Sequence, residues 1–429
     1  MIKKNTLLST SLLAGIFFCW VSGEIFAQTT LRISHQWPGG TGDVRDEMFR
    51  IMAREIEAAE VDIVVRIYPA QSLFKAGDQW SALIRGRLDI TGLPLDYASG
   101  RHPQFNATLM PGLVKSHDHA RRLNSSLFMN SIREIIEDEG LIVLADAWLS
   151  GGFVSTENCI LWPNDIQGLV TRGAGPAFER MLAGAGASIA SMPSSEIYTA
   201  MQTGVLDAAN TSSASLVTFR LYEHAQCLTA PGEHALWFMY QPVLMAQQSW
   251  NKLQPQQQSV LRRASKLAED YFFQESKKLD AEMEKVYQDA GVRVVHMNAE
   301  QAQAWKEIAT ESSYRVFAEE VPGGAELIDQ ALAMPCRGTH RLRVFGEVDR
   351  EGLFHLAILD QIVERGAALE ILQPVDDRKT AVVADHHDHL VAGQHRRIDV
   401  GVHHQVGPVA DHYDGHPLAV LRHGVPPAA

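Results

Sequence analysis

One arginine in this sequence points most directly to chemistry, because it stands between an apolar run and a glycine-rich turn. Arg172 ends the run 169–171, and a Gly-Ala-Gly-Pro turn then leads through Pro176 into an Ala-rich amphipathic segment. This pattern predicts a strand that ends at Arg172 and a helix that begins near Pro176, since proline suits the first turn of a helix. A helix amino end exposes unpaired N–H groups, and a guanidinium can bind both oxygens of a carboxylate. We therefore expect an anion site at Arg172, with an ion pair to an Asp or Glu of the same sheet edge as the alternative.

Arg172 also belongs to a longer pattern of fixed spacing. A first element ends at Arg172, and a second, "MPSSEIYTAMQTGVLD", follows at residues 192–207. Both elements resemble the signature segment of the DctP-type solute-binding proteins of TRAP transporters. The resemblance extends from about Thr30 to Met334. The matching positions are Asp165, Gly168, Leu169 and Arg172 in the first element, and Met192, Pro193, Ser195, Glu196, Tyr198, Ala200, Gln202, Gly204 and Asp207 in the second.

The resemblance implies a fold and a function. It implies an α/β, two-lobed periplasmic binding protein fold, with two α/β domains around a ligand cleft and a long helix that spans both. It also implies that Arg172 forms a salt bridge to the carboxylate of an organic acid. The protein would then be a receptor rather than an enzyme, and would deliver its ligand to TRAP membrane permease subunits driven by an ion gradient. A further polar contact falls at Asn210 or Thr211, and the register between them stays open.

One departure from the family pattern bears on the ligand. Many members carry a second arginine on the crossing strand, where this chain has Gly152. The loss of that cation predicts a monocarboxylate whose apolar part contacts aromatic side chains. The aromatic and ring candidates are His35, Trp37, Tyr97, Trp148, Phe153, Trp237 and Phe238. Each aromatic residue is alternatively a core residue, because aromatic side chains dominate protein cores.

Composition limits the class of protein. A chain of 429 residues with 46% hydrophobic residues is long enough to form two domains. The net charge of -13 argues against a nucleic-acid partner, because a phosphate-binding surface needs clustered Lys and Arg. We expect a monomer or dimer without a cofactor or resident metal. The turn at Arg172 is not a dinucleotide loop, since Phe178 occupies the third glycine position, and the sequence contains no G-x-S-x-G element for a serine hydrolase.

The first 27 residues predict export. They contain a basic leader, an apolar core and a small residue before Gln28, which together are typical of a secretory signal peptide. We therefore expect a periplasmic protein. Three cysteines remain after cleavage, at Cys159, Cys227 and Cys336. A Cys159–Cys227 bridge is one alternative, but so sparse a set favours buried free thiols.

Alternating helix and strand patterns organise the chain into two units. We expect lobe I over residues 28–150 plus about 236–275, where 236–250 returns as a strand pair to the first unit. Lobe II is expected over 151–235 plus about 276–334. A helical pattern of more than 30 residues after Gln254 is long enough to reach both lobes. "HDH" at 117–119 is interpreted as the solvated start of one long helix rather than a metal site.

Residues 335–429 form an atypical extension, in which eleven of the 18 histidines lie. Their spacings fit no metal-ligand pattern, so we favour a segment without selected structure. The alternative function for the chain is a secreted metal-binding protein or hydrolase that uses this His-rich region.

Overall fold

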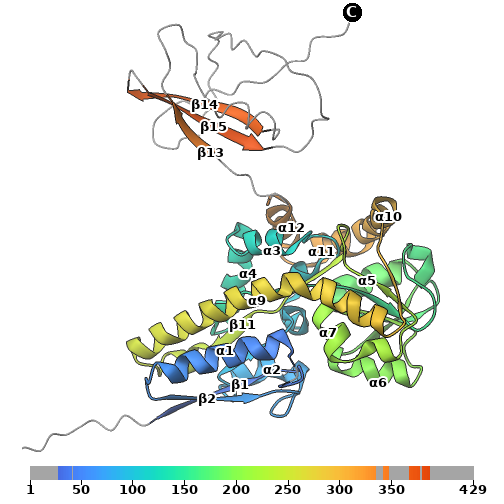
Figure 1. Cartoon of the computed structure of the whole chain (residues 1–429), viewed down its shortest axis with the longest axis horizontal. Coiled ribbons are helices and arrows are strands. Elements are labelled where there is room, and N and C mark those ends of the chain that lie inside the picture. Colours follow the sequence, from blue (N-terminus) through green and yellow to red (C-terminus); the bar gives the residue numbers. More distant parts are fainter. Residues whose placement is uncertain (1–27, 41, 335–341, 347–366, 377–378, 387–429) are drawn as a thin grey trace, which may run out of the picture.

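The structure is a computed structural model that describes residues 28–40, 42–334, 342–346, 367–376 and 379–386. Two β-sheets, each covered by helices, form the body of the protein (Figure 1). We call the parts built on the first and second sheets lobe I and lobe II. None of the helices in these described ranges is both long and apolar enough to cross a membrane. The predicted signal peptide lies outside the described residues.

Lobe I is built on a five-stranded sheet in the order β2-β1-β3-β11-β4. Its strands are β1 (Thr29–Ser34), β2 (Ile63–Tyr68), β3 (Ile90–Gly92), β4 (Leu141–Ala145) and β11 (Val243–Ala246). β1 is parallel to β2 and β3, whereas β11 is antiparallel to β3 and β4. Parallel strands end at the same edge, so the loops after β1 and β3 come together there.

Lobe II is built on a seven-stranded sheet in the order β12-β9-β5-β8-β6-β7, with β10 paired to β5. Its strands are β5 (Trp148–Ser155), β6 (Val170–Gly173), β7 (Ser188–Ser191), β8 (Ala208–Ser212), β9 (Cys227–Thr229), β10 (Trp237–Tyr240) and β12 (Arg293–Val295). β5 is buried along its whole length. Its first half pairs with β10 and its second half with β8 and β9. The predicted return strand pair is therefore divided, since β10 joins lobe II and only β11 joins lobe I.

Helices cover both sheets, and the longest extends over both lobes. The α-helices are α1 (Val44–Ala58), α2 (Gln79–Ile84), α3 (His117–Leu123), α4 (Leu127–Asp138), α5 (Pro176–Gly184), α6 (Ile197–Gln202), α7 (Ser213–Thr218), α8 (Gln247–Trp250), α9 (Pro255–Asp289), α10 (Ala299–Ala309), α11 (Arg315–Glu320) and α12 (Gly324–Leu332). Short turns are η1 (Ala76–Asp78), η2 (Leu95–Ala98), η3 (Pro103–Leu109), η4 (Pro163–Ile166), η5 (Ser194–Glu196), η6 (Leu221–Glu223) and the π-helical η7 (Thr310–Tyr314). α9 has 35 residues and contacts α1 of lobe I and α7 of lobe II (Figure 1). It is the predicted long helix.

The cores show where the chain crosses between lobes. α9 contributes Phe272 to a core cluster of lobe I and Tyr287 to a core cluster of lobe II. α12 packs Leu327 and Ile328 into a lobe I cluster beside α4, although the sequence places residues 276–334 in lobe II. The apolar face of α12 is covered by α4, α11 and η3, which belong to the same cluster.

A disulfide joins two segments of lobe II. Cys159 and Cys227 are bonded, with Cα atoms 5.1 Å apart. The expectation of free thiols is therefore wrong for this pair, because the chain after β5 turns back beside β9. Cys336 lies outside the described residues.

The segment that begins "HDH" does not form one solvated helix. α3 ends at Leu123, and Ser126 begins α4 by accepting a hydrogen bond from the N–H of Met129 at 3.2 Å. His119 is 2% exposed, and burial together with the Arg122 charge lowers its pKa to about 4. His117 contacts Asp280 of α9 at 3.5 Å. Both rings therefore face the protein rather than solvent.

Part of the C-terminal extension forms a third sheet. β13 (Leu342–Gly346), β15 (Lys379–His386) and β14 (Ala367–Asp376) pair antiparallel in that order. No strand of this sheet pairs with either lobe within the described ranges. The expectation of a segment without structure does not hold for these three strands, while most of the histidines fall outside the described residues.

We expect the Cys159–Cys227 bridge to stabilise lobe II. The bridge closes a separation of 68 residues, for which loss of loop entropy in the unfolded chain stabilises the fold by about 2–4 kcal/mol. Urea unfolding should show a lower midpoint for the Cys159→Ser/Cys227→Ser variant than for the oxidised protein. Adding a reductant should lower the midpoint of the wild type and leave the variant unchanged. Equal midpoints for the two proteins would contradict a stabilising bridge.

Candidate functional site

Arg172 lies at the carboxyl end of β6, where the sequence places it. β6 is parallel to β7 and β8, and the turn after it passes through Gly175 into α5. Gly175 has φ +79° and stands before Pro176, the first residue of α5. Glycine adopts this left-handed backbone conformation most easily, and the conformation lets the chain turn directly into the helix. The arginine and the amino end of α5 therefore meet at one edge of lobe II.

The Arg172 guanidinium is buried without a carboxylate partner. The residue is 2% exposed, its Nε donates to the carbonyl of Met192 at 3.0 Å, and its Nη1 donates to the carbonyl of Asn210 at 2.8 Å. Neither bond uses Nη2. No acidic oxygen among the described residues lies within ion-pair distance of Arg172, so the alternative of a sheet-edge ion pair is not supported. Backbone carbonyls hold the cation in place, and no described carboxylate pairs with it directly.

A cavity of about 240 Å³, part of which is open to solvent, lies against Arg172 between the lobes. We call it the Arg172 cavity. It is lined by Trp37, Arg45, Pro94, Asp96, Tyr97, Arg172, Ala174, Ser194, Thr211, Ser212, Ser215, Trp237 and Met239. Five of the eight predicted ligand-binding residues line it: Arg172, Thr211, Trp37, Tyr97 and Trp237. The indole N–H groups of Trp37 and Trp237 have no hydrogen-bond partner among the described residues.

Asp96 brings a carboxyl group from lobe I into this cavity. It lies in η2, in the loop after β3, and is 4% exposed. A Cβ built on Gly175 would lie 2.8 Å from its Oδ2, so the carboxyl group covers the start of α5. Burial raises the pKa of Asp96 to about 7; the Arg172 charge acts in the opposite direction, and Glu179 adds to the rise. The carboxyl group therefore ionises less readily than an exposed aspartate.

A second buried arginine lines the cavity, but its charge is compensated. Arg45 of α1 pairs with Asp43 at 2.7 Å, and both side chains are fully buried. Its Nη1 also donates to Ser215 Oγ at 2.9 Å, at the start of α7 in lobe II. The guanidinium carbon lies 4.7 Å from the centre of the Trp37 ring. Arg45 thus links the two lobes and fixes Trp37, while the ion pair leaves no net charge.

Hydrogen bonds also cross the cleft on its other side. The Ser194 N–H of lobe II donates to the hydroxyl oxygen of Tyr97 in lobe I at 3.0 Å. Nearby, Gln71 donates to Ser195 Oγ at 3.1 Å. Because these residues come from loops of different lobes, the bonds require the lobes to be close together.

Three predicted site residues, His35, Asn210 and Phe153, lie away from the Arg172 cavity. His35 is fully buried, its Nε2 bonds Asp46 at 3.2 Å, and its ring stacks on Trp37 and Phe49. Burial alone would raise the pKa of Asp46. Hydrogen bonds from His35, from the backbone N–H of Gly40 and from Arg50 outweigh burial and lower that pKa to about 2. His35 therefore supports Trp37 from behind. Both residues follow the end of β1 at Ser34, where strand alternation no longer applies, and His35 is drawn away from the cavity by its bond to Asp46 and its stacking on Phe49.

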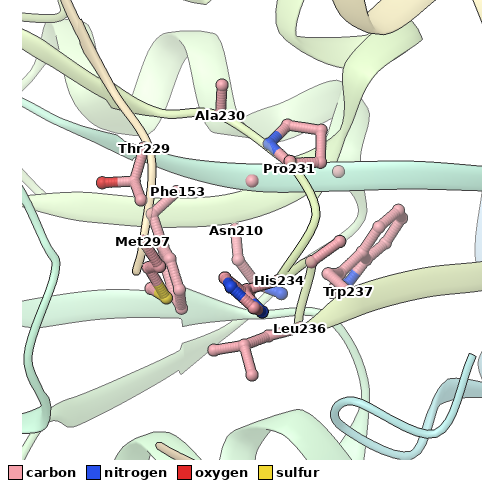
Figure 2. Close-up of a pocket in the computed structure, with 13 residues that line it drawn as sticks. Phe153, Asn210, Thr229, Ala230, Pro231, His234, Leu236, Trp237 and Met297 are labelled. Carbon is pink, nitrogen blue, oxygen red and sulfur yellow. The ribbon is translucent and has the colours of Figure 1, made fainter. Parts of the chain in front are cut away.

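Asn210 and Phe153 line a second cavity of about 340 Å³, part of which is open to solvent (Figure 2). Asn210 Oδ1 accepts a hydrogen bond from the N–H of Ala174 at 3.2 Å, and Phe153 stacks on Trp305. Trp237 lines both cavities. Because Asn210 and Thr211 are successive residues of β8, their side chains face opposite ways, and only Thr211 faces the Arg172 cavity.

The two remaining aromatic candidates are core residues. Trp148 donates to Asn124 Oδ1 at 2.8 Å and packs with Tyr240, and Phe238 lies in the same cluster of lobe I. Neither lines the Arg172 cavity.

The position of the missing second arginine is closed by backbone. A Cβ on Gly152 would lie 2.2 Å from the carbonyl oxygen of Thr229, and one on Gly151 would lie 2.0 Å from that of Thr211. Any side chain at Gly152 requires β9 to move away from β5. The glycines are thus needed for the close pairing of β5 with its neighbours.

Sequence reasoning missed Asp96 and Arg45. Asp96 is the one acidic residue in the otherwise apolar run "TGLPLDYA", beside the predicted Tyr97. Arg45 stands on an otherwise apolar helix face two residues after Asp43. A charged residue at an apolar position was the available signal in both cases. The described residues contain no group of three or more His, Cys, Asp or Glu side chains suited to a metal ion.

Comparison with known proteins gives a consistent result. Residues 34–320 match the family model described as bacterial extracellular solute-binding protein, family 7. A solute-binding protein of Albidiferax ferrireducens is 37% identical over 308 residues, covering 71% of this chain and 91% of the relative. The sialic acid-binding periplasmic protein SiaP of Vibrio cholerae is 26% identical over 284 residues, covering 65% of this chain and 86% of that protein.

Solved structures agree with the fold. A TRAP periplasmic solute-binding protein from Rhodoferax ferrireducens with bound malonate has a TM-score of 0.68 and 35% identity, and the match covers 71% of this chain and 98% of that one. A TRAP periplasmic protein from Sulfitobacter with bound galacturonate has a TM-score of 0.66 at 19% identity, covering 71% of this chain and 100% of that one. The predicted two-lobed α/β fold is confirmed.

The hydrogen bond between Tyr97 and Ser194 predicts a measurable effect on closure. Tyr97→Phe removes a bond that forms only when the lobes meet, which should weaken binding of an organic acid by about 3- to 10-fold. Titration calorimetry measures the change. Tyr198→Phe is the control, because Tyr198 bonds Glu223 on the exposed side of lobe II. Equal affinities for the wild type and Tyr97→Phe would show that this bond does not contribute to the bound state.

Proposed function

Because this chain belongs to the bacterial extracellular solute-binding proteins of family 7, we propose that it binds its ligand in the Arg172 cavity, through a salt bridge between Arg172 and a carboxylate. The protein is a periplasmic TRAP-type receptor for small organic acids and not an enzyme. Its proposed partner is a TRAP membrane permease, to which it delivers the bound acid.

The buried, uncompensated charge of Arg172 carries this proposal. Removing a cation from water costs on the order of several kcal/mol unless a counter-charge replaces the lost hydration. Met192 and Asn210 carbonyls satisfy part of the guanidinium, and its Nη2 is left for another acceptor. A ligand carboxylate can supply both the acceptor and the counter-charge. Trp37 and Trp237, whose indole N–H groups have no described partner, also line this cavity.

The charges around the cavity favour a ligand with one carboxylate. Arg45 is neutralised by Asp43, so Arg172 is the single uncompensated cation of the cavity lining. A second carboxylate would meet Asp96, and Gly152 offers no cation in its place. The relative with bound malonate, a dicarboxylate, represents the rival specificity. Apolar surface on the ligand would instead gain about 25 cal/mol per Å² against the indole rings of Trp37 and Trp237.

Arg172→Lys tests the salt bridge. An ammonium cannot reproduce the planar two-oxygen contact or keep both carbonyl contacts, so affinity for the organic acid should fall by about tenfold or more while the fold is retained. Thermal unfolding with and without ligand reports both quantities. Arg180→Lys is the matched control, because Arg180 pairs with Glu320 on the surface of α5. An unchanged ligand-induced shift in Arg172→Lys would place the carboxylate elsewhere.

Isobutyrate and methylmalonate form a matched pair for the second prediction, since one methyl group of the first is a carboxylate in the second. At pH 8, isobutyrate should bind more tightly by about tenfold or more, because the additional buried charge has no cationic partner. Titration calorimetry with both acids and with malonate decides the question. Tighter binding of the two dicarboxylates would reveal a second positive group in the bound state.

A further inference from the structure

The Arg172 cavity contains a carboxyl oxygen that no described donor satisfies. Asp96 is 4% exposed, and its Oδ1 has no hydrogen-bond partner among the described residues. Buried polar atoms are almost always hydrogen-bonded, because an unpaired one loses its hydration without replacement. Under the proposed function the ligand fills this cavity, so the missing donor is expected from the ligand.

The position of Asp96 restricts where that donor must be. Its carboxyl group lies against Gly175, which is three residues after Arg172 and directly precedes α5. Asp96 and Arg172 are close enough for the arginine charge to act on the carboxyl group. A small ligand whose carboxylate meets Arg172 would therefore present the adjoining atom to Asp96.

We propose that Asp96 selects organic acids that carry an O–H or N–H donor beside the carboxylate bound by Arg172. This inference rests on the proposed function of Arg172 and adds the substrate class: hydroxy acids, amino acids or cyclic amides of such acids. Such a ligand satisfies both unpaired groups of the cavity, since its carboxylate accepts from Arg172 and its donor bonds Asp96 Oδ1. A simple alkyl acid satisfies only the first.

The same carboxyl group acts against a second ligand carboxylate. Three charged groups besides Asp96 bear on this part of the cavity: Arg172 from β6, Glu179 from α5, and Arg45 from α1, which is paired with Asp43. Ionised Asp96 would repel the second carboxylate. Burial raises the pKa of Asp96 to about 7, so acidification below that pH protonates it and removes the repulsion. Selection against dicarboxylates should therefore weaken as the pH falls from 8 to 6.

Lactate tests the proposal, because it is isobutyrate with one methyl group replaced by a hydroxyl group. Wild-type protein should bind lactate about tenfold more tightly than isobutyrate, since the hydroxyl donates to a charged acceptor. In Asp96→Ala this preference should disappear. In Asp96→Asn, which keeps an acceptor oxygen but not the charge, the lactate preference should persist and methylmalonate should bind about tenfold more tightly than in the wild type. Asp138→Asn is the control, as an exposed charge at the end of α4.

The outcomes separate this inference from the proposed function. If no acid binds any variant, the Arg172 proposal itself fails. A second outcome is that the acids bind and that Arg172→Lys lowers their affinity, but that the wild type and Asp96→Ala each bind lactate and isobutyrate equally well. That result overturns the role of Asp96. If Asp96→Ala does not fold, the methylmalonate affinity of Asp96→Asn decides alone, and a value equal to that of the wild type and Asp138→Asn overturns it. Measuring methylmalonate affinity at pH 8 and pH 6 adds a check. The ratio of wild-type to Asp96→Asn affinity should rise on acidification, because only the wild type has a charge at this position to lose.

Discussion

A buried cation without an anion is the constraint on which the site depends. Arg172 is held by carbonyls from two different segments, Asn210 in the middle of β8 and Met192 in the loop between β7 and η5. The order β8-β6-β7 is what brings both carbonyls to the same guanidinium. The strand order, the turn at Gly175 and the loop at Met192 are therefore all needed to hold one charge in place. A site built in this way is rigid before the ligand arrives, which limits the entropy lost on binding.

The two buried arginines of the cavity show how the surroundings of a charge determine its use. Arg45 has its own carboxylate two residues away and contacts hydroxyl groups of α7, so its role is to connect the lobes and to orient Trp37. Arg172 has only neutral partners among the described residues, so its charge remains available. Asp96 complements this arrangement, since its Oδ1 is an acceptor without a described donor. The cavity thus contains unpaired groups of both kinds, which is the pattern of a recognition site rather than of a core.

Much of this arrangement was predictable from sequence, and the misses have physical causes. The helix–strand alternation and the long helix specify the two lobes, and the turn chemistry around Pro176 places Arg172 correctly. Successive residues in a strand face opposite ways, so a shift of one position decides between Asn210 and Thr211. His35 and Trp37 lie in the loop after β1, whose path no strand pattern encodes. Arg45 and Asp96 reach the cavity from lobe I, and their approach to Arg172 depends on tertiary packing that no local pattern encodes. The Cys159–Cys227 pairing, over 68 residues, has the same origin.

The contact between Gly152 and Thr229 has a consequence for how this receptor can diverge. Thr229 cannot simply move to admit a side chain, because its hydroxyl donates to the carbonyl of Ile160 at 2.7 Å and Cys227, two residues earlier, is bonded to Cys159. A single mutation of Gly152 to arginine would therefore disrupt the sheet before it could add a cation to the cleft. Changes of ligand in this lineage should instead accumulate in the loops of lobe I, where side chains meet the cavity without bearing on the sheet.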